Sequence, residues 1–513
     1  MVRYNCFAIT HHERTLFFPF ALSSDRRSRI EGSSFNFLDH MNTNPIRVRF
    51  APSPTGLMHL GNVRTALMNY LFAQQKKGTF IIRIEDTDLQ RNFDPEASKI
   101  ISDLTWLGLD YQEGPLKGGP HMPYFQSQRT AIYEKYISQL RDKDKIYRCF
   151  CTPEELEKKR ERQAALKLPP RYDRTCLKRS AADTQKLIDD KVPYIWRLQL
   201  DQSKSVTIHD LAHGTITFEF KNFSDFPLTR ADGTVTFIFA NFVDDMVMDI
   251  THVIRGEDHL TNTANQAALY ELFGIKIPIF WHLPILCNAE GKKLSKRDFG
   301  FSLNDLINAG YLPEAIDNYL ATIGGGSFDQ EIMNLDELAQ KINFDNIHST
   351  GHMRYDVEKL RWLNQKWIGK LAPQDLLNRC MPYLLKEYPQ AKDFDHSTLS
   401  SLVQTVKTEM HLLADITDVL KFIFVAPAVD VSQFTEDQKN VATLVKAHLS
   451  QINNPEQFVA QLKTEAKAQS IPIGQLFWFM RMALLGKEHG PAIHELIKML
   501  GTQEATARIH KLV

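Results

Sequence analysis

The chain has 513 residues, too many for one hydrophobic core, and this length indicates two to four domains. With 43% apolar and 24% charged residues and a formal net charge of zero, it has a globular composition without the overall basic charge of many nucleic-acid binders. No apolar run approaches the roughly 18 residues of a membrane span, so we expect no membrane partner. Six cysteines in a chain of this size favour a reducing, cytoplasmic setting over a disulfide framework.

Residues 1–43 differ from the rest of the chain. A short apolar run over 16–22 is interrupted by Pro19 and is followed by arginines, as in a targeting segment. Acidic residues on both sides of the run argue against a presequence. We interpret 1–43 as a tail outside the fold, disordered or not native, with Met41 as the working start.

The first regular elements are predicted from residue 46 onward. Alternating apolar residues over 46–50 predict a strand, and helical spacing over 63–71 predicts a helix that Lys77-Gly78 ends. Residues 80–84 predict a second, buried strand. A strand, a helix and a strand joined by short links indicate a parallel pair in a Rossmann-like unit.

The same pattern resumes after residue 233. Residues 234–239, 249–254 and 279–286 predict strands, and 262–273 predict a helix. We therefore interpret 124–233 as an insertion between two halves of one α/β domain. Beyond residue 297 the pattern becomes helical, for example over 312–323 and 473–485.

Two separated motifs have the chemistry of a phosphate site. His59 and Gly61 lie where the first strand gives way to a helix, and a helix N-terminus favours phosphate. Gly61 would let a planar ring approach the backbone, and Asn62 is a candidate helix cap. The glycine-flanked loop with Lys293 and Lys296 follows a later strand and supplies mobile positive charges suited to a triphosphate. Either motif alone has an ordinary structural explanation, whereas the pair indicates one nucleotide site.

The two motifs resemble the signature sequences of class I aminoacyl-tRNA synthetases. Segments 49–56, 83–88, 243–245, 252–258 and 312–315 resemble the bacterial type of the glutamyl-tRNA synthetase family. The resemblance runs from about residue 46 to the C-terminus and is dense through residue 320. It implies an α/β fold with a Rossmann-like parallel-sheet catalytic domain, an inserted acceptor-binding domain and an all-helical C-terminal anticodon-binding region.

The expected boundaries follow from this assignment. The catalytic domain would comprise 44–123 and 234–300, with the acceptor-end-binding insertion at 124–233. A helical stem-contact region would follow at 301–372, and the helical anticodon-binding domain at 373–513.

The resemblance also implies a reaction. The family activates L-glutamate with ATP to glutamyl-adenylate and transfers glutamyl to the 3′ terminal adenosine of tRNA(Glu), with Mg²⁺ on the phosphates. Such a reaction needs no side-chain nucleophile, because positioning and charge stabilisation suffice. His59 and Lys296 would stabilise the departing pyrophosphate with help from Lys293. Gly61 and Asn62 would line the ATP site, with Gly61 making room for adenine.

Further residues would bind the amino acid. Arg49 and Arg255 would hold the side-chain carboxylate, Glu85 would face the ammonium, and the rest of the expected site comprises Ala51, Ser53, Phe237 and Asn241. A dicarboxylate needs planar cations, and its ammonium needs a carboxylate. The chain departs from the family at 235–237, where Val-Thr-Phe replaces the usual Pro-Thr-Tyr. A tyrosine hydroxyl is therefore missing at Phe237, unless water or a neighbouring group replaces it.

The insertion contains three closely spaced cysteines. Cys149, Cys151, Tyr172 and Cys176 resemble the zinc site of some family members, with Tyr172 as an uncommon fourth ligand. The alternative is that these are free, buried thiols. The insertion is also locally basic, and the resemblance makes this part of the surface for the tRNA acceptor end.

We expect a monomer that binds tRNA(Glu), L-glutamate and ATP. Four alternatives stay open: an enzyme that also charges tRNA(Gln), a truncated relative that glutamylates a modified tRNA base, a glutaminyl enzyme, and a catalytically weakened tRNA-binding paralogue. The long helical C-terminal part argues against the truncated relative. The pair of Arg49 and Arg255 argues against the glutaminyl enzyme, and the departure at Phe237 is the support for the paralogue.

Overall fold

The computed structural model describes residues 45–88, 92–295, 297–323, 330–344, 351 and 353–513. It also describes the backbone of an antiparallel strand pair, β1 (Phe7–Ile9) and β2 (Leu16–Phe18). The remainder of the predicted 1–43 tail lies outside the described residues. The chain divides into two compact units, residues 1–305 with 317–357, and residues 306–316 with 358–513. No described helix is both long and apolar enough to cross a membrane.

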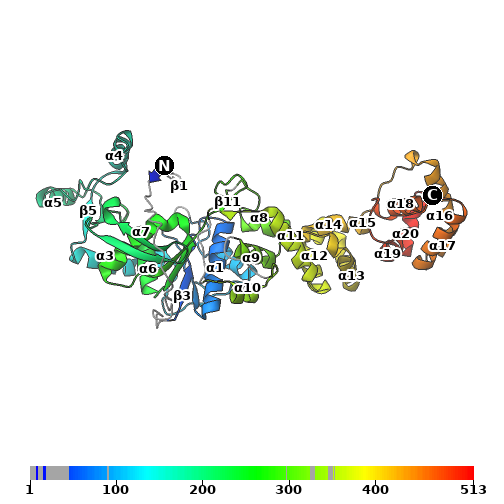
Figure 1. The fold of residues 1–513 in the computed structure, drawn as a ribbon, viewed down its shortest axis with the longest axis horizontal. Helices are drawn as coiled ribbons and strands as arrows, with labels where there is room; N and C mark the ends of the chain where they lie inside the picture. The colour runs from blue at the N-terminus through cyan, green and yellow to red at the C-terminus, as the bar shows by residue number, and fades with distance from the viewer. Residues whose placement is uncertain are drawn as a thin grey trace, which may run out of the picture. The chain divides into compact units, whose positions relative to one another are not determined.

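The predicted strand–helix–strand unit is confirmed. β3 (Arg47–Phe50) and β4 (Thr79–Ile82) are parallel, and α1 (Leu60–Lys76) connects them (Figure 1). Lys77 ends the helix in the left-handed conformation at φ 51°. A Cβ on Gly78 would lie 2.6 Å from the Ile46 carbonyl oxygen, so only glycine lets the chain enter β4 beside β3.

The second half of the parallel architecture is a four-stranded sheet in the order β8-β7-β10-β9. β9 (His252–Gly256) and β7 (Ser205–Asp210) both run parallel to β10 (Ile279–Leu283), whereas β8 (Gly214–Glu219) pairs antiparallel with β7. Two strands from residues 124–233 are thus part of the sheet that contains β9 and β10. The backbone N–H of Thr251 donates to the Arg47 carbonyl at 3.0 Å, which holds the start of β9 beside β3.

Two of the expected strands are corrected. Residues 234–239 do not form a strand, because α6 (Phe237–Val247) begins inside them and buries Phe239, Ala240, Phe242 and Val243. The alternation of β-branched and aromatic residues there is overridden by packing of the helix in the core. The expected strand 279–286 is interrupted at Pro284, with β11 limited to Leu286–Cys287. The expected helix 262–273 is confirmed within α7 (Leu260–Phe273).

Other elements complete the first unit. They are α2 (Ser98–Trp106), α3 (Thr130–Asp142), β5 (Ile146–Cys149), α4 (Pro153–Ala165), α5 (Ala181–Asp189), β6 (Ile195–Leu198), α10 (Leu335–Lys341) and β12 (Met353–Arg354). β5 and β6 pair antiparallel, and β11 and β12 pair parallel. Helices α3, α6 and α7 contribute to one hydrophobic core with strands β7 to β10.

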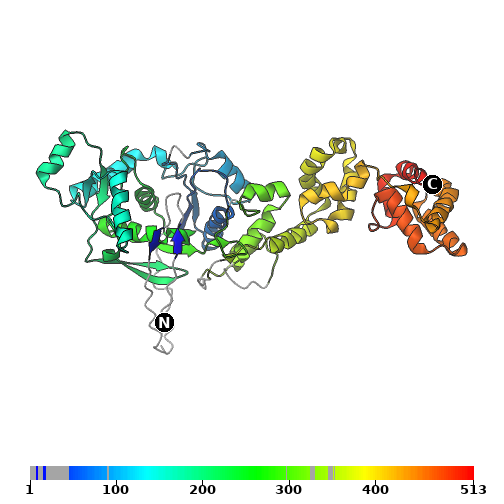
Figure 2. The same cartoon turned by 90° about the horizontal axis from the view of Figure 1, so that it is seen from above.

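The second unit is built from helices, as Figure 2 shows for the part from α12 onward. The helices are α12 (Pro373–Glu387), α13 (His396–Val406), α14 (Ile416–Val419), α15 (Lys421–Phe424), α16 (Glu436–His448), α17 (Pro455–Ala468), α18 (Ile473–Leu485), α19 (Ile493–Leu500) and α20 (Thr502–His510). α8 (Leu303–Ala309), α9 (Pro313–Thr322) and α11 (Val357–Lys370) begin in one unit and end in the other. The predicted helices over 312–323 and 473–485 are confirmed.

Polar contacts fix the start of this unit. Glu314 accepts two hydrogen bonds from Arg379, at 2.8 and 3.0 Å. Asn364 accepts from the Leu312 backbone and donates to the His411 carbonyl. The motif at 312–315 therefore has a structural role here.

Candidate active site

The nucleotide side of the candidate site is built on the start of α1. His59 is the N-cap of this helix, and its Nδ1 accepts from the Asn62 backbone N–H at 3.2 Å. The expectation that Asn62 caps the helix is therefore wrong: His59 is the cap, and its ring accepts from the backbone N–H of Asn62 itself. A Cβ on Gly61 would lie 3.0 Å from two atoms of the His59 ring, so the glycine makes room for this ring.

The protonation of His59 follows from these contacts. Burial and the nearby charge of Lys293 lower the pKa of His59 to about 4, so the ring is neutral at pH 7. Since Nδ1 accepts, the neutral ring carries its proton on Nε2. An N–H at a helix N-terminus is suited to donating to a phosphate oxygen.

The lysine loop lies against the same helix start. Lys293 is exposed, and its Nζ lies 3.0 Å from Asp258 Oδ2. The backbone N–H of Leu60 donates to the Phe301 carbonyl at 2.9 Å, and the rings of His59 and Phe301 are 5.3 Å apart. The structure therefore brings His59 and Lys293 into one electrostatic environment. Lys296 lies outside the described residues.

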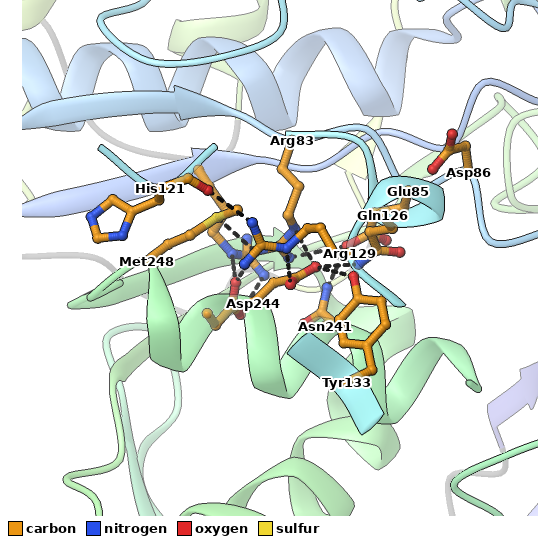
Figure 3. Close-up of polar contacts among 12 residues, drawn as sticks. Arg83, Glu85, Asp86, His121, Gln126, Arg129, Tyr133, Asn241, Asp244 and Met248 are labelled. Atoms are coloured by element: carbon orange, nitrogen blue, oxygen red, sulfur yellow. Dashed lines mark hydrogen bonds and ion pairs between the residues drawn. The ribbon is translucent and has the colours of Figure 1, made fainter. Parts of the chain in front are cut away.

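The expected amino-acid pocket contains a buried network of charges. Arg49 donates to both oxygens of Asp245, at 2.9 and 3.2 Å. Arg83 donates to Asp245 at 2.6 Å and to Glu85 at 3.1 Å, and Glu85 also accepts from Asn241 at 2.6 Å. Burial raises the pKa of Glu85, and the neighbouring arginines oppose that shift. Arg83 lies at the centre of the contacts drawn in Figure 3.

A second carboxylate anchors this network from behind. Asp244 is fully buried and accepts from Arg129 at 2.6 Å, from Gln126 at 2.9 Å and from the Tyr133 hydroxyl at 2.9 Å. Figure 3 shows that these partners surround its carboxylate. Two neighbouring residues of α6 thereby connect helix α3 to strand β3, which carries Arg49, and to Arg83, which directly follows β4.

Arg255 differs from the other arginines of the pocket. Its Nη2 donates to Thr263 Oγ1 and to Gln266 Oε1, both at 2.7 Å. Its Nε and Nη1 are buried and have no hydrogen-bond partner among the described residues. Burial, reinforced by the charge of Arg49, lowers the pKa of Arg255 to about 9. An incompletely paired, buried guanidinium is a binding site for an anion.

The remaining expected residues are placed around this pocket. Ala51 is half-buried and Ser53 is exposed, in the segment that follows β3. The backbone N–H of Glu85 donates to the Pro52 carbonyl at 2.9 Å, so this segment continues beside the chain after β4. Phe237 is the first residue of α6, and its ring lies 5.5 Å from that of His259.

The predicted metal ligands also converge. The sulfur atoms of Cys149, Cys151 and Cys176 lie within 4.8 Å of one another, with Cys151 and Cys176 at 3.6 Å. The Tyr172 hydroxyl lies 3.3 Å from Cys149 Sγ and 3.6 Å from Cys151 Sγ. Tetrahedral zinc with Zn–S bonds of about 2.3 Å separates its sulfur ligands by about 3.8 Å. The donor set therefore fits a zinc ion.

Comparison with known proteins agrees with both halves of this architecture. Residues 45–362 match the family of class I tRNA synthetases (E and Q), catalytic domain, and residues 375–513 match an anticodon binding domain. The chain belongs to the class I tRNA synthetases of the E and Q family.

Named relatives of the synthetase cover nearly the same length. A glutamate–tRNA ligase of Finegoldia magna is 37% identical over 483 residues, which are 91% of this chain and 99% of the relative. Glutamate–tRNA ligase 1 of Pseudothermotoga lettingae is 38% identical over 475 residues, 91% of this chain and 100% of the relative. The crystal structure of a glutamate tRNA ligase from Elizabethkingia meningosepticum, in complex with its amino acid, has a TM-score of 0.81 at 32% identity and covers 91% of this chain and 99% of that one.

The synthetase has further pocket residues to which the sequence analysis assigned no role. Asp244 and Asp245 hold the arginines in place, and their signal was present, since two carboxylates in an apolar helix indicate buried ion pairs. Gln266 joins the two ends of the pocket, because its Oε1 accepts from Arg255 and its Nε2 donates to Asn241. Nothing in its surrounding sequence distinguishes this glutamine from an ordinary polar helix residue.

Proposed function

We propose that this synthetase is a glutamate–tRNA ligase that forms glutamyl-adenylate and then glutamyl-tRNA(Glu). The observation that carries the proposal is the unpaired guanidinium edge of Arg255. A side-chain carboxylate would bind there, and Glu85 offers a carboxylate for the substrate ammonium. An amide side chain would leave the buried charge of Arg255 without a counter-charge.

The chemistry needs no protein nucleophile. An α-carboxylate oxygen of glutamate attacks the α-phosphorus of ATP, and the bond to the bridging oxygen breaks as pyrophosphate leaves. The hydroxyl of the terminal adenosine of tRNA then attacks the adenylate carbonyl carbon. Its proton passes to the departing phosphate, and AMP leaves with the electron pair of the broken bond. Rate enhancement comes from orienting these groups and stabilising the charge that develops on the phosphates.

The residues divide this work by charge. His59 donates from Nε2 to a phosphate oxygen, and Lys293 adds a mobile positive charge, with Lys296 in the same role. Arg49 is held by Asp245, so it would orient the substrate without moving far. Mg²⁺, when bound with ATP, would neutralise part of the phosphate charge.

Zinc binding by Cys149, Cys151, Cys176 and Tyr172 is part of the proposal. The hydrophobic cluster around these residues is small, and α4 and α5 contribute no buried residues, so a metal would stabilise a segment that lacks a core of its own. Metal analysis of the purified protein should give about one zinc per chain. The Cys151→Ser variant should lose it, whereas Cys380→Ser, in another part of the chain, should retain it. Wild-type protein that is folded but free of zinc would contradict the assignment.

We also propose a monomer in the cytoplasm. A thiolate metal site requires reduced cysteines, which a reducing compartment maintains. Gel filtration with light scattering checks the oligomeric state.

The decisive test is aminoacylation of purified tRNA(Glu) and tRNA(Gln), together with ATP–pyrophosphate exchange with and without tRNA. The proposal expects exchange that depends on glutamate and not on glutamine, and charging of tRNA(Glu). Charging of both tRNAs identifies a non-discriminating enzyme. No exchange and no charging would overturn the proposal in favour of a tRNA-binding paralogue.

A further inference from the structure

A chain of buried hydrogen bonds runs behind Arg255, on the side away from its unpaired edge. Thr263 Oγ1, which accepts from Arg255 Nη2, lies 2.8 Å from His282 Nε2. His282 Nδ1 in turn lies 2.6 Å from Asp210 Oδ2. The three residues behind Arg255 are each 0% exposed, so these contacts are shielded from water.

The direction of each hydrogen bond follows from its partners. The other oxygen of Asp210 accepts from the backbone N–H groups of Ala212 and His213, both at 2.9 Å. These bonds and the His282 ring hold the pKa of Asp210 below its usual value, so the carboxylate only accepts and His282 carries a proton on Nδ1.

The remaining proton lies on Thr263. Burial lowers the pKa of His282, so its Nε2 is an acceptor at pH 7. The hydroxyl proton of Thr263 then points to Nε2, which at 2.8 Å is nearer than the alternative acceptor, the His259 carbonyl at 3.2 Å. Its oxygen is left to accept from Arg255.

This arrangement fixes one end of a flexible side chain. Both protons of Arg255 Nη2 are used, one by Thr263 and one by Gln266. Asp245 and Glu85 attract the guanidinium electrostatically, and Glu85 is the group expected to meet the substrate ammonium. Without the restraint at Nη2, Arg255 would turn toward these carboxylates and neutralise them, closing the pocket from inside.

We propose that Asp210, His282 and Thr263 are positioning residues that hold the Arg255 guanidinium away from Glu85 and thereby set the affinity for the substrate side-chain carboxylate. This inference rests on the proposed function. It also assigns a role to Asp210, the last residue of β7, which lies in the segment predicted to be an insertion. β7 is paired with β10, the strand of His282, so the sheet itself places the carboxylate beside the ring.

The test is the steady-state aminoacylation of tRNA by the full chain, with glutamate varied at saturating ATP and tRNA. Thr263→Val keeps the shape of the side chain and removes the hydroxyl. It should raise the KM for glutamate about tenfold, the order expected for one hydrogen bond to a charged group, with kcat and the KM for ATP little changed. Thr263→Ser restores the hydroxyl and should restore the KM.

A second variant acts at the other end of the chain. Asp210→Asn keeps the size of the side chain, but its amide can donate to Nδ1, which would move the ring proton to Nε2. Thr263 Oγ1 would then accept from both His282 and Arg255, and its proton would turn to the His259 carbonyl at 3.2 Å. The hydroxyl would no longer donate to the ring, which makes it a weaker acceptor for Arg255. The KM for glutamate should rise in Asp210→Asn. In the double variant with Thr263→Val, this KM should be no higher than in the weaker-binding single variant, because both substitutions act through the same chain of hydrogen bonds.

The outcomes separate the two levels of the proposal. A wild-type protein without glutamate-dependent activity would overturn the proposed function and this inference with it. An active wild type together with a folded Thr263→Val variant of unchanged glutamate KM would overturn the positioning role alone. A lower kcat together with similar rises in the KM for glutamate and the KM for ATP, without rescue by Thr263→Ser, would also overturn it, since this pattern indicates a general structural effect. Circular dichroism verifies the fold, and Asp210→Asn tests the chain should Thr263→Val fail to fold.

Discussion

The incompletely paired state of Arg255 predicts an unusual separation of stability from activity. We consider replacing Arg255 by Met, with Arg83→Met as the matched control. Both arginines are buried, but Arg83 contacts three carboxylates, whereas Arg255 has two neutral hydrogen-bond partners and two unpaired nitrogens among the described residues. Because Arg255 has no direct counter-charge, burying its charged guanidinium destabilises the ligand-free protein.

The magnitude follows from the pKa of Arg255. A fall from 12.5 to about 9 corresponds to about 5 kcal/mol against the charged form, at about 1.4 kcal/mol per pH unit. The two hydrogen bonds of Nη2 return about 1.5–3 kcal/mol each. These contributions nearly cancel, so Arg255→Met should change the free energy of unfolding by less than about 2 kcal/mol. Arg83→Met leaves buried carboxylates short of a partner and should cost about 3–5 kcal/mol.

Urea unfolding followed by tryptophan fluorescence measures the free energy of unfolding of both variants. Because the chain has two compact units that can unfold separately, the same unfolding transition must be compared in each variant. Glutamate at about one hundred times its Kd should stabilise the wild type by about 2.7 kcal/mol and leave Arg255→Met unaffected. If Arg255→Met loses as much stability as Arg83→Met, Arg255 is compensated in the ligand-free protein and the reasoning fails.

Three further predictions concern other parts of the structure. Phe237→Tyr should lower the KM for glutamate by about tenfold, and an unchanged or higher KM in steady-state aminoacylation would contradict this. Asp245→Asn should cost about 3–5 kcal/mol at pH 7, because Arg49 and Arg83 lower the pKa of Asp245. The ionised carboxylate stabilises the fold fully above the ordinary Asp pKa of about 4, and this contribution is lost as the pH falls toward the lowered pKa. The difference in free energy of unfolding between wild type and variant, measured with urea, should therefore narrow below about pH 4. A constant difference would refute the assignment. Chelation of zinc should speed trypsin cleavage within 153–189, measured by gel electrophoresis, whereas equal rates would argue against a stabilising metal.

Local patterns predicted the elements that depend on local chemistry. The strand, helix and strand from residue 46 to 84 follow from periodicity, and His59 was identified because a helix start attracts phosphate. The same reasoning failed at 234–239, where alternation typical of a strand lies in the first turn of a buried helix. It also failed at Asn62, since a sequence does not show that the His59 ring turns back onto the helix N-terminus.

The partners of the predicted residues could not be found in this way. Arg49 was expected to face the substrate, but the identity of its anchor, Asp245, depends on how a strand and a helix 196 residues apart pack together. His282 and Asp210 are 72 residues apart and meet only because β7 and β10 pair in one sheet. Long-range pairing of this kind is decided by tertiary packing, which no local pattern contains.

The buried charges explain why such partners matter for specificity. Three buried arginines of the pocket, Arg49, Arg83 and Arg129, form ion pairs with the buried carboxylates Glu85, Asp244 and Asp245. Arg255 forms no ion pair with a described residue, and its two unpaired nitrogens leave an excess positive charge there. Glutamate carries a net charge of −1 and would neutralise this excess, whereas glutamine is neutral and would bury it further. Because an uncompensated buried charge costs several kcal/mol, the proposed pocket would discriminate by the charge of the ligand more than by its shape. Discrimination would then depend on keeping Arg255 away from the pocket's own carboxylates, which is the role we propose for its hydrogen bonds to Thr263 and Gln266.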